Sequence, residues 1–140
     1  SNFNEFVKGI KKQKEKPLVV QAQNDEFNRK ALEYGKFDVL LSPENGDRKL
    51  KLRQADSGLN HVLAKIAAKN KIAIGVNLNE IGAMSKENKA IELAKIRQNI
   101  KICRKAKANL AISSKNKKEA SLLLISLGAS TQQASEELYF

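Results

Sequence analysis

The chain is poor in aromatic residues: it has no tryptophan, two tyrosines and five phenylalanines among 140 residues. Isoleucine, leucine, valine and alanine must therefore fill any interior, and a hydrophobic fraction of 41% is sufficient for one folded domain. No segment supplies the closely spaced aromatic residues on which proteins stack single-stranded nucleic acid. If the chain binds nucleic acid, we expect it to read phosphates and shape.

Cysteine and histidine each occur once, as Cys103 and His61. A single cysteine excludes an intrachain disulfide and a thiolate metal site, and it favours a reducing compartment. Residues 1–4 lack the charged-then-apolar order of a secretion signal, and no apolar run approaches the roughly 20 residues of a membrane span. We therefore expect a cytoplasmic protein, with Cys103 as a small core residue on the apolar face of a helix.

Acidic residues are a minority, with 15 against 26 lysines and arginines, so the net charge is +11 and the pI about 9.8. This imbalance favours a polyanionic partner, either nucleic acid or an anionic membrane surface. The alternative is a lysine-rich solvated face in a protein from a salt-rich or hot environment. Because the cations are clustered, nucleic acid is the preferred interpretation.

Strand and helix patterns alternate along the chain. Apolar runs predict strands at residues 18–23, 37–42, 72–78 and 109–114, and helical periodicity predicts helices at 3–16, 24–34, 57–69, 87–107, 119–127 and 131–138. This order predicts parallel βαβ units with right-handed crossovers. No glycine-rich phosphate loop follows a strand, which argues against a dinucleotide or P-loop site. Four strands are too few for a closed barrel of about 250 residues, so we expect an open sheet or an incomplete barrel.

The stretch around His61 combines three signals. Asp56 or Ser57 is the predicted helix N-cap. An apolar stripe follows at helical spacing and comprises Leu59, Val62, Leu63, Ile66 and Ala67. On another face lie His61, Lys65 and Lys69, and the loop just before the cap carries Arg48, Lys49, Lys51 and Arg53. Amides of a helix N-terminus beside cations suit a phosphate, so His61 either bonds locally or contacts RNA.

The long helix at residues 87–107 carries a second basic stripe. Its buried positions are predicted at Leu93, Ile96, Ile100 and Cys103, and its basic positions are Arg97, Lys101, Arg104 and Lys105. Such a stripe alone is usually only solvated. Together with the basic loop and the lysine-rich N-terminal helix, it can follow a nucleic-acid backbone by counterion release.

Carboxylates offer an alternative, catalytic interpretation. Four of them follow predicted strand ends, namely Asp25, Glu44, Asp47 and Glu80. We favour caps and solvated loop charges for these, since a barrel metallohydrolase would need several histidine and carboxylate ligands. Ser113 and Ser114 also end a strand, and hydrogen bonding there is favoured over a nucleophile because no base lies nearby in the sequence.

Several segments carry a family resemblance. The string DSGLNHVLAK at 56–65, with IAIGVNL at 72–78, RQNIKICRK at 97–105 and NLAISS at 109–114, closely resembles the archaeal ribonuclease P protein component 3 family. The similarity extends from about residue 17 onward. It implies a TIM-type barrel, related to metal-dependent phosphoesterases but without their histidine-rich metal sites.

The resemblance also implies a function. Family members are non-catalytic, RNA-binding subunits of the ribonucleoprotein that removes 5′ leaders from precursor tRNA, with catalysis in the RNA and its magnesium. We thus expect no cofactor in this chain. The implied partners are the ribonuclease P RNA and a small α/β subunit. His61 and the following lysines match the family's basic signature, and Arg53 matches a basic position before it, although Gln54 and Ala55 depart from the pattern.

Two departures from the family bear on the fold. Its first strand–helix units, which would precede Lys16, are absent, and the loop after Ser114 lacks the usual Arg-Pro-Asp-Leu-type segment. We expect one domain over residues 1–140 that forms a partial barrel of about four strands, as a fragment or completed by a second copy or another chain. Two alternatives stay open: a metal-dependent phosphoesterase using Asp25 or Glu80, and a structural protein that contacts acidic protein.

Overall fold

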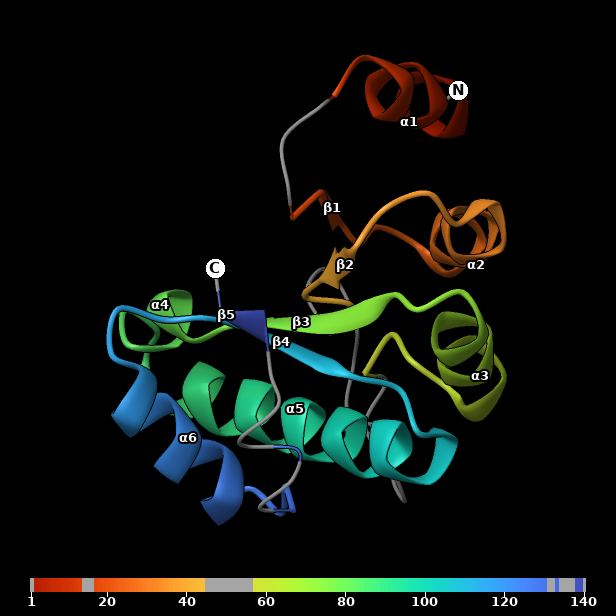
Figure 1. The fold of residues 1–140 in the computed structure, drawn as a ribbon. Helices are drawn as coiled ribbons and strands as arrows, with labels where there is room; N and C mark the ends of the chain where they lie inside the picture. Colours follow the sequence, from red (N-terminus) through yellow and green to blue (C-terminus); the bar gives the residue numbers. More distant parts are fainter. Residues whose placement is uncertain (1, 14–16, 45–56, 131–132, 134–137, 140) are drawn as a thin grey trace.

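The fold is a parallel α/β sheet with helices packed on it (Figure 1). The computed structural model describes residues 2–13, 17–44, 57–130, 133, 138 and 139. The five strands follow one another in chain order across the sheet, and every neighbouring pair is parallel. They are β1 (Val19–Gln21), β2 (Val39–Leu41), β3 (Ala73–Asn77), β4 (Leu110–Ser113) and β5 (Leu138–Tyr139). The four predicted strands are confirmed.

Helices connect these strands as crossovers, since parallel neighbours cannot be joined by a tight turn. The helices are α1 (Asn2–Lys12), α2 (Asp25–Tyr34), α3 (His61–Lys69), α4 (Leu78–Ile81), α5 (Lys86–Ala106) and α6 (Lys117–Ser126). Figure 1 shows α2, α3, α5 and α6 arranged around the sheet, with α1 beyond α2. The predicted α/β fold is therefore confirmed as part of a TIM-type barrel.

The last predicted helix, at residues 131–138, is wrong at its end. Leu138 begins β5 and pairs with Ala111 of β4. Gln133 is helical, and residues 131, 132 and 134–137 lie outside the described residues. The sheet offers Leu138 backbone partners that a local periodicity argument does not include, so pairing overrides the helical pattern.

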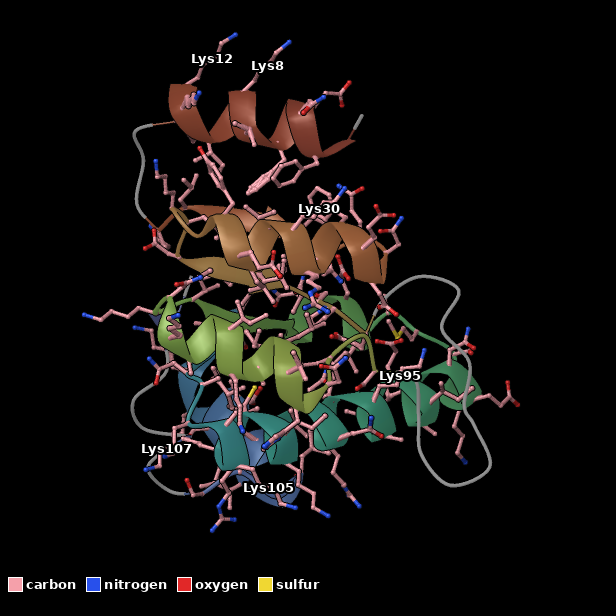
Figure 2. All side chains as sticks on the ribbon, turned by 90° about the vertical axis from the view of Figure 1, so that its right-hand side faces the viewer. Lys8, Lys12, Lys30, Lys95, Lys105 and Lys107 are labelled. Atoms are coloured by element: carbon pink, nitrogen blue, oxygen red, sulfur yellow. The ribbon has the colours of Figure 1, made fainter. Side chains whose placement is uncertain are left out.

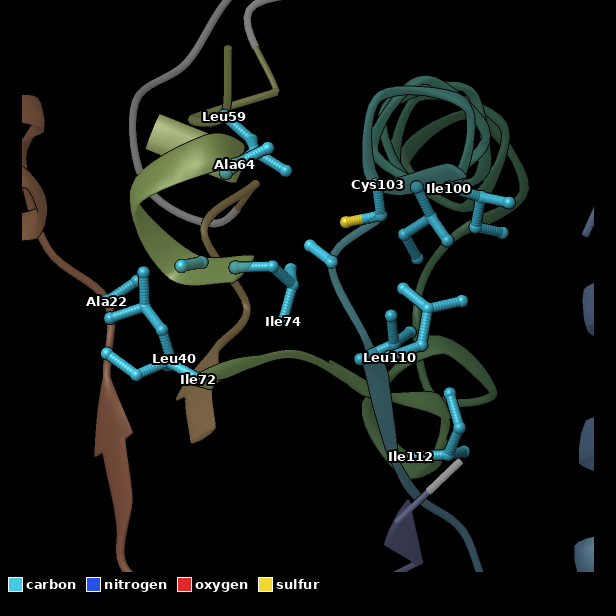
Figure 3. Packing of buried hydrophobic residues seen from close by; sticks show 14 of the residues in the cluster. Ala22, Leu40, Leu59, Ala64, Ile72, Ile74, Ile100, Cys103, Leu110 and Ile112 are labelled. Atoms are coloured by element: carbon cyan, nitrogen blue, oxygen red, sulfur yellow. The ribbon is translucent and has the colours of Figure 1, made fainter. Parts of the chain in front are cut away.

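Branched aliphatic side chains form the core between the sheet and the helices (Figure 3). Leu40, Ile74 and Ile112 project from three neighbouring strands and are at most 1% exposed. Cys103 of α5 is fully buried, and burial raises the pKa of its thiol to about 12. The prediction that Cys103 is a core residue is confirmed.

The opposite face of the sheet carries smaller side chains. Val39, Ala73 and Ala111 form a separate buried cluster there, because successive residues of a strand point to opposite faces. Gly75 lies on the same face, and a β-carbon at this position would come within 2.7 Å of Val39 Cγ1. The close approach of β2 and β3 therefore requires glycine at position 75.

Candidate nucleic-acid interface

The first basic surface is the outward face of α3. His61, Lys65 and Lys69 are all exposed and follow one another at intervals of four residues, so they share one face of the helix. Leu63, Ala64 and Ala67 fill the inward face. The predicted basic loop, with Arg48, Lys49, Lys51 and Arg53, lies outside the described residues.

The start of α3 differs from the prediction. Asn60, and neither Asp56 nor Ser57, is the N-cap: its Oδ1 accepts the Leu63 N–H at 2.9 Å. Asp56 lies outside the described residues. Because the helix begins at His61, Val62 falls outward and is 55% exposed, so its assignment to the apolar stripe is wrong.

Ser57 instead connects the segment before α3 to α5 by hydrogen bonds. Its hydroxyl accepts a hydrogen bond from Gln98 Nε2 at 3.0 Å, and its carbonyl accepts one from Asn99 Nδ2 at 3.1 Å. Ser57 and Asn99 are both buried. These bonds, together with direct packing of α3 on α5, fix the two basic helices relative to each other.

The second basic surface lies along α5. As predicted, Ile96, Ile100 and Cys103 are buried, whereas Leu93 is partly buried. Arg97, Lys101, Arg104 and Lys105 are exposed on the other side of the helix. The first three of these cations line a hollow of about 420 Å³, whose other wall is the end of α6 with Ser126, Leu127 and Gly128. We call this hollow the α5–α6 groove.

The cations of both surfaces are available to an anionic partner. The ion pairs seen between described residues join Arg29 to Glu33 and Lys30 to Glu26 on α2, and Lys95 to Glu92 on α5. None of them involves the α3 face or the α5–α6 groove. A phosphate approaching either surface would therefore not have to displace a carboxylate of the described residues.

The carboxylates of the catalytic alternative are dispersed. Asp25 and Glu80 are exposed on α2 and α4, Glu44 is buried after β2, and Asp47 lies outside the described residues. Among the residues that the structure describes, no three histidine, cysteine or carboxylate side chains gather where they could hold a metal ion. Ser114 at the end of β4 accepts the Asn116 N–H at 3.3 Å, consistent with the expected strand-end hydrogen bonding.

The sequence analysis did not predict a buried cluster of charged residues formed by Glu44 after β2 with Glu92 and Lys95 of α5. Lys95, only 2% exposed, directs its Nζ toward the Glu44 carbonyl at 3.4 Å and lies 3.8 Å from Glu92 Oε1. Burial raises the pKa of Glu44 to about 8 and also raises the pKa of Glu92. Among the residues that the structure describes, Glu44 Oε2 has no hydrogen-bond partner. The i, i+3 spacing of Glu92 and Lys95 was the available signal, but such pairs are usually exposed.

Comparison with known proteins identifies the relatives of this fold. A ribonuclease P protein component 3 from Methanococcus vannielii is 31% identical over 116 residues, which span 81% of this chain and 47% of the relative. The chain is related to ribonuclease P protein component 3. The predicted resemblance is thus confirmed, and the chain spans about half the length of the curated relatives it matches.

A second archaeal component 3 protein and one solved structure are also similar to this chain. The protein from Methanocaldococcus jannaschii is 32% identical over 62% of this chain, covering 34% of its own length. A cryo-EM structure of archaeal ribonuclease P with mature tRNA contains a chain with a TM-score of 0.76 and 25% identity, covering 95% of this chain and 57% of that one. No family model matches the chain. Within the described residues, no helix has the length and apolarity needed to cross a membrane.

Proposed function

We propose that this chain is an RNA-binding subunit of ribonuclease P that supports the RNA's removal of 5′ leaders from precursor tRNA in the cytoplasm. The observation that carries the proposal is the pair of exposed basic surfaces, the α3 face and the α5–α6 groove, on a fold related to component 3. In this proposal the chain carries no catalytic residue and no cofactor. The magnesium ions are bound by the partner RNA, which carries out the catalysis.

The RNA contacts follow from charge and position. The proposed contacting residues are His61, Lys65 and Lys69 on α3, Arg97, Lys101, Arg104 and Lys105 on α5, and the loop residues Arg48, Lys49, Lys51 and Arg53. Cations on a surface without paired carboxylates neutralise phosphates and release counterions, which makes binding dependent on salt. Such contacts position an RNA without reading its sequence.

Protein partners are proposed from the edge of the sheet. The Val39 N–H donates to the Leu18 carbonyl and the Ala22 N–H donates to the Leu41 carbonyl, so alternate residues of β1 bond to β2. The polar backbone groups of Val19 and Gln21 consequently point away from β2, and no other strand of the described residues pairs with β1. A groove of about 390 Å³ runs beside this edge, between α1 and β1. We propose that a second copy or another chain completes the sheet here, and that a small α/β subunit also joins the complex.

The test measures binding of the chain to the ribonuclease P RNA of Methanocaldococcus jannaschii at increasing salt. Arg97→Ala/Lys101→Ala/Arg104→Ala should bind more weakly, and the slope of log Kobs against log salt should become shallower by about 2 to 3. A control variant, Lys86→Ala/Lys115→Ala/Lys118→Ala, loses the same net charge at exposed positions outside both basic surfaces. Equal slopes for both variants would show that the groove makes no specific contribution.

A second measurement addresses catalysis. Precursor tRNA cleavage should require the RNA, and the protein alone should not hydrolyse a generic phosphodiester with added Mn²⁺. Metal-stimulated turnover that disappears in Asp25→Asn or Glu80→Gln would instead support a phosphoesterase.

A further inference from the structure

Three lysines have a backbone conformation that lysine rarely adopts. Among the described residues other than glycine, only Lys36, Ser42, Lys71 and Lys107 have positive φ, and the φ values of the three lysines are 47°, 57° and 62°. Each lysine lies in the connection between a helix and the next strand: α2 to β2, α3 to β3 and α5 to β4. The left-handed region brings the β-carbon close to the following carbonyl, so glycine is favoured there.

Helix α6 provides an internal comparison. It ends with the Ala129 N–H donating to the Leu124 carbonyl at 2.9 Å, with Gly128 at φ 104° just before. The ends of α3 and α5 have the same geometry, with bonds from Ile72 to Ala67 and from Ala108 to Cys103. At these two ends a lysine occupies the position that glycine occupies in α6, so the helix-ending motif itself does not call for lysine.

The lysines lie on neighbouring connections at one edge of the sheet. Strands β2, β3 and β4 are adjacent and parallel, so the connections entering them meet at their N-terminal edge. Asn70, next to Lys71, donates from Nδ2 to the Leu32 carbonyl of α2 at 2.6 Å, which fixes the ends of α2 and α3 together. All three lysines are exposed, and Figure 2 shows Lys107 at the surface near Lys105.

Carboxylates near this edge are already engaged. Asp38 Oδ2 accepts the Leu18 N–H at 2.7 Å, and Glu33 pairs with Arg29 at 3.0 Å. Within the described part of the chain no ion pair to these lysines is seen; the ammonium of Lys36 lies 5.5 Å from the centre of the Tyr34 ring. Since Lys69, Arg104 and Lys105 lie within the last turns of α3 and α5, the edge is positively charged.

We propose that Lys36, Lys71 and Lys107, the lysine rim, bind the phosphate backbone of RNA along the N-terminal edge of the sheet. The proposal rests on the RNA-binding function proposed above and adds a contact surface beyond the α3 face and the α5–α6 groove. Lys71 and Lys107 adopt the unfavourable conformation at the position that Gly128 occupies in α6, and Lys36 adopts it one residue after Gly35 at the end of α2. An unfavourable backbone conformation at these positions indicates a role for the side chain. That side chain is a long, exposed cation, which suits a polyanion.

The competing explanation is that these cations stabilise the negative ends of α2, α3 and α5. The two explanations make opposite predictions for stability. Asparagine tolerates the left-handed conformation and lacks charge, so it separates them. If the lysines serve the helix ends, replacing them with asparagine lowers stability; if they serve RNA, stability stays equal or rises.

The experiment compares Lys36→Asn/Lys71→Asn/Lys107→Asn with the unmodified chain and with the control variant Lys86→Ala/Lys115→Ala/Lys118→Ala of equal net charge. The probes are a short duplex RNA and the Methanocaldococcus jannaschii ribonuclease P RNA. For three lost phosphate contacts, raising salt from about 50 to about 200 mM should weaken the unmodified chain about 40-fold more than the variant. The midpoint of urea unfolding should not fall. Lys→Gly at the same positions should raise this midpoint and give the same loss of salt dependence.

Each result has a defined meaning. An unchanged salt slope in the asparagine variant, with the groove variant still impaired, overturns the lysine rim and leaves the proposed function intact. A lower unfolding midpoint in the asparagine variant also overturns it, in favour of helix-end stabilisation. Salt-independent or absent RNA binding by the unmodified chain overturns both the rim and the proposed RNA contacts.

Discussion

Replacing Glu44 with glutamine should stabilise the protein in alkaline solution and destabilise it slightly to moderately in acid. Glu44 is 3% exposed, and burial of its carboxyl group raises the pKa of that group from 4.5 to about 8. Its own backbone hydrogen bond and Lys95 oppose this rise, whereas Glu92 and Glu80 contribute to it. The folded protein therefore holds a proton that the unfolded chain releases at much lower pH.

The sign of the effect follows from proton linkage. Between pH 4.5 and about 8 the folded state binds more protons than the unfolded state, so the free energy of unfolding falls as pH rises. At about 1.4 kcal/mol for each pH unit, the loss reaches about 3 kcal/mol at pH 7 and about 5 kcal/mol above pH 8. Stability from this group is fully present below pH 4.5.

Glutamine removes this linkage while preserving the shape of the side chain. Its amide places a donor at the position of Glu44 Oε2, for which the described part of the chain offers no partner, and an unsatisfied buried group costs about 1 to 3 kcal/mol. Glu44→Gln should consequently gain about 2 to 4 kcal/mol at pH 9 and lose up to about 2 kcal/mol at pH 5, where the linkage removed is only about 0.7 kcal/mol. Urea unfolding at both pH values measures the difference. Glu87→Gln, at an exposed position in the first turn of α5, is the control. Parallel stability profiles for Glu44→Gln and the unmodified protein would refute the reasoning.

Three further substitutions and one labelling experiment test the sheet packing, the α3 cap and the burial of Cys103. Gly75→Ala should destabilise the protein by about 1 to 3 kcal/mol in thermal unfolding, because the added β-carbon would lie 2.7 Å from Val39 Cγ1. The control is Gly82→Ala, which should be neutral or stabilising, because Gly82 has a φ of −61° and a β-carbon there would meet no atom within 4 Å. Asn60→Ala should lower the free energy of unfolding by about 1 kcal/mol through loss of the α3 cap, and an unaffected value would reject that cap. Cys103 should resist a thiol reagent until the protein unfolds, since it is fully buried with a pKa of about 12; rapid labelling of the native protein would contradict this.

The sequence was sufficient to predict the four main strands and the helices between them. Continuous apolar runs such as residues 72–78 are typical of parallel strands buried on both faces, and the intervening helical periodicity required crossovers. The prediction failed where several partners compete for one segment. Ser57 and Asn60 are both good caps, and only the packing of α5 determines that Ser57 bonds to Gln98 and leaves Asn60 to cap α3.

The candidate surfaces were likewise predicted in part. Regular spacing correctly placed His61, Lys65 and Lys69 on one exposed face, because helical geometry determines it. The hollow beside α5 depends on the end of α6, which approaches only in the folded state. Equally, the left-handed lysines could not be recognised from composition, since a lysine in a connection has no sequence signal for positive φ.

The central claim is that this chain binds the ribonuclease P RNA through cations on α3 and α5. The most direct measurement is the salt dependence of its affinity for the Methanocaldococcus jannaschii RNA, before and after Arg97, Lys101 and Arg104 are replaced with alanine. We expect a steep slope for the unmodified chain that becomes shallower by about 2 to 3 in the variant. A slope that is the same for both proteins would contradict the claim.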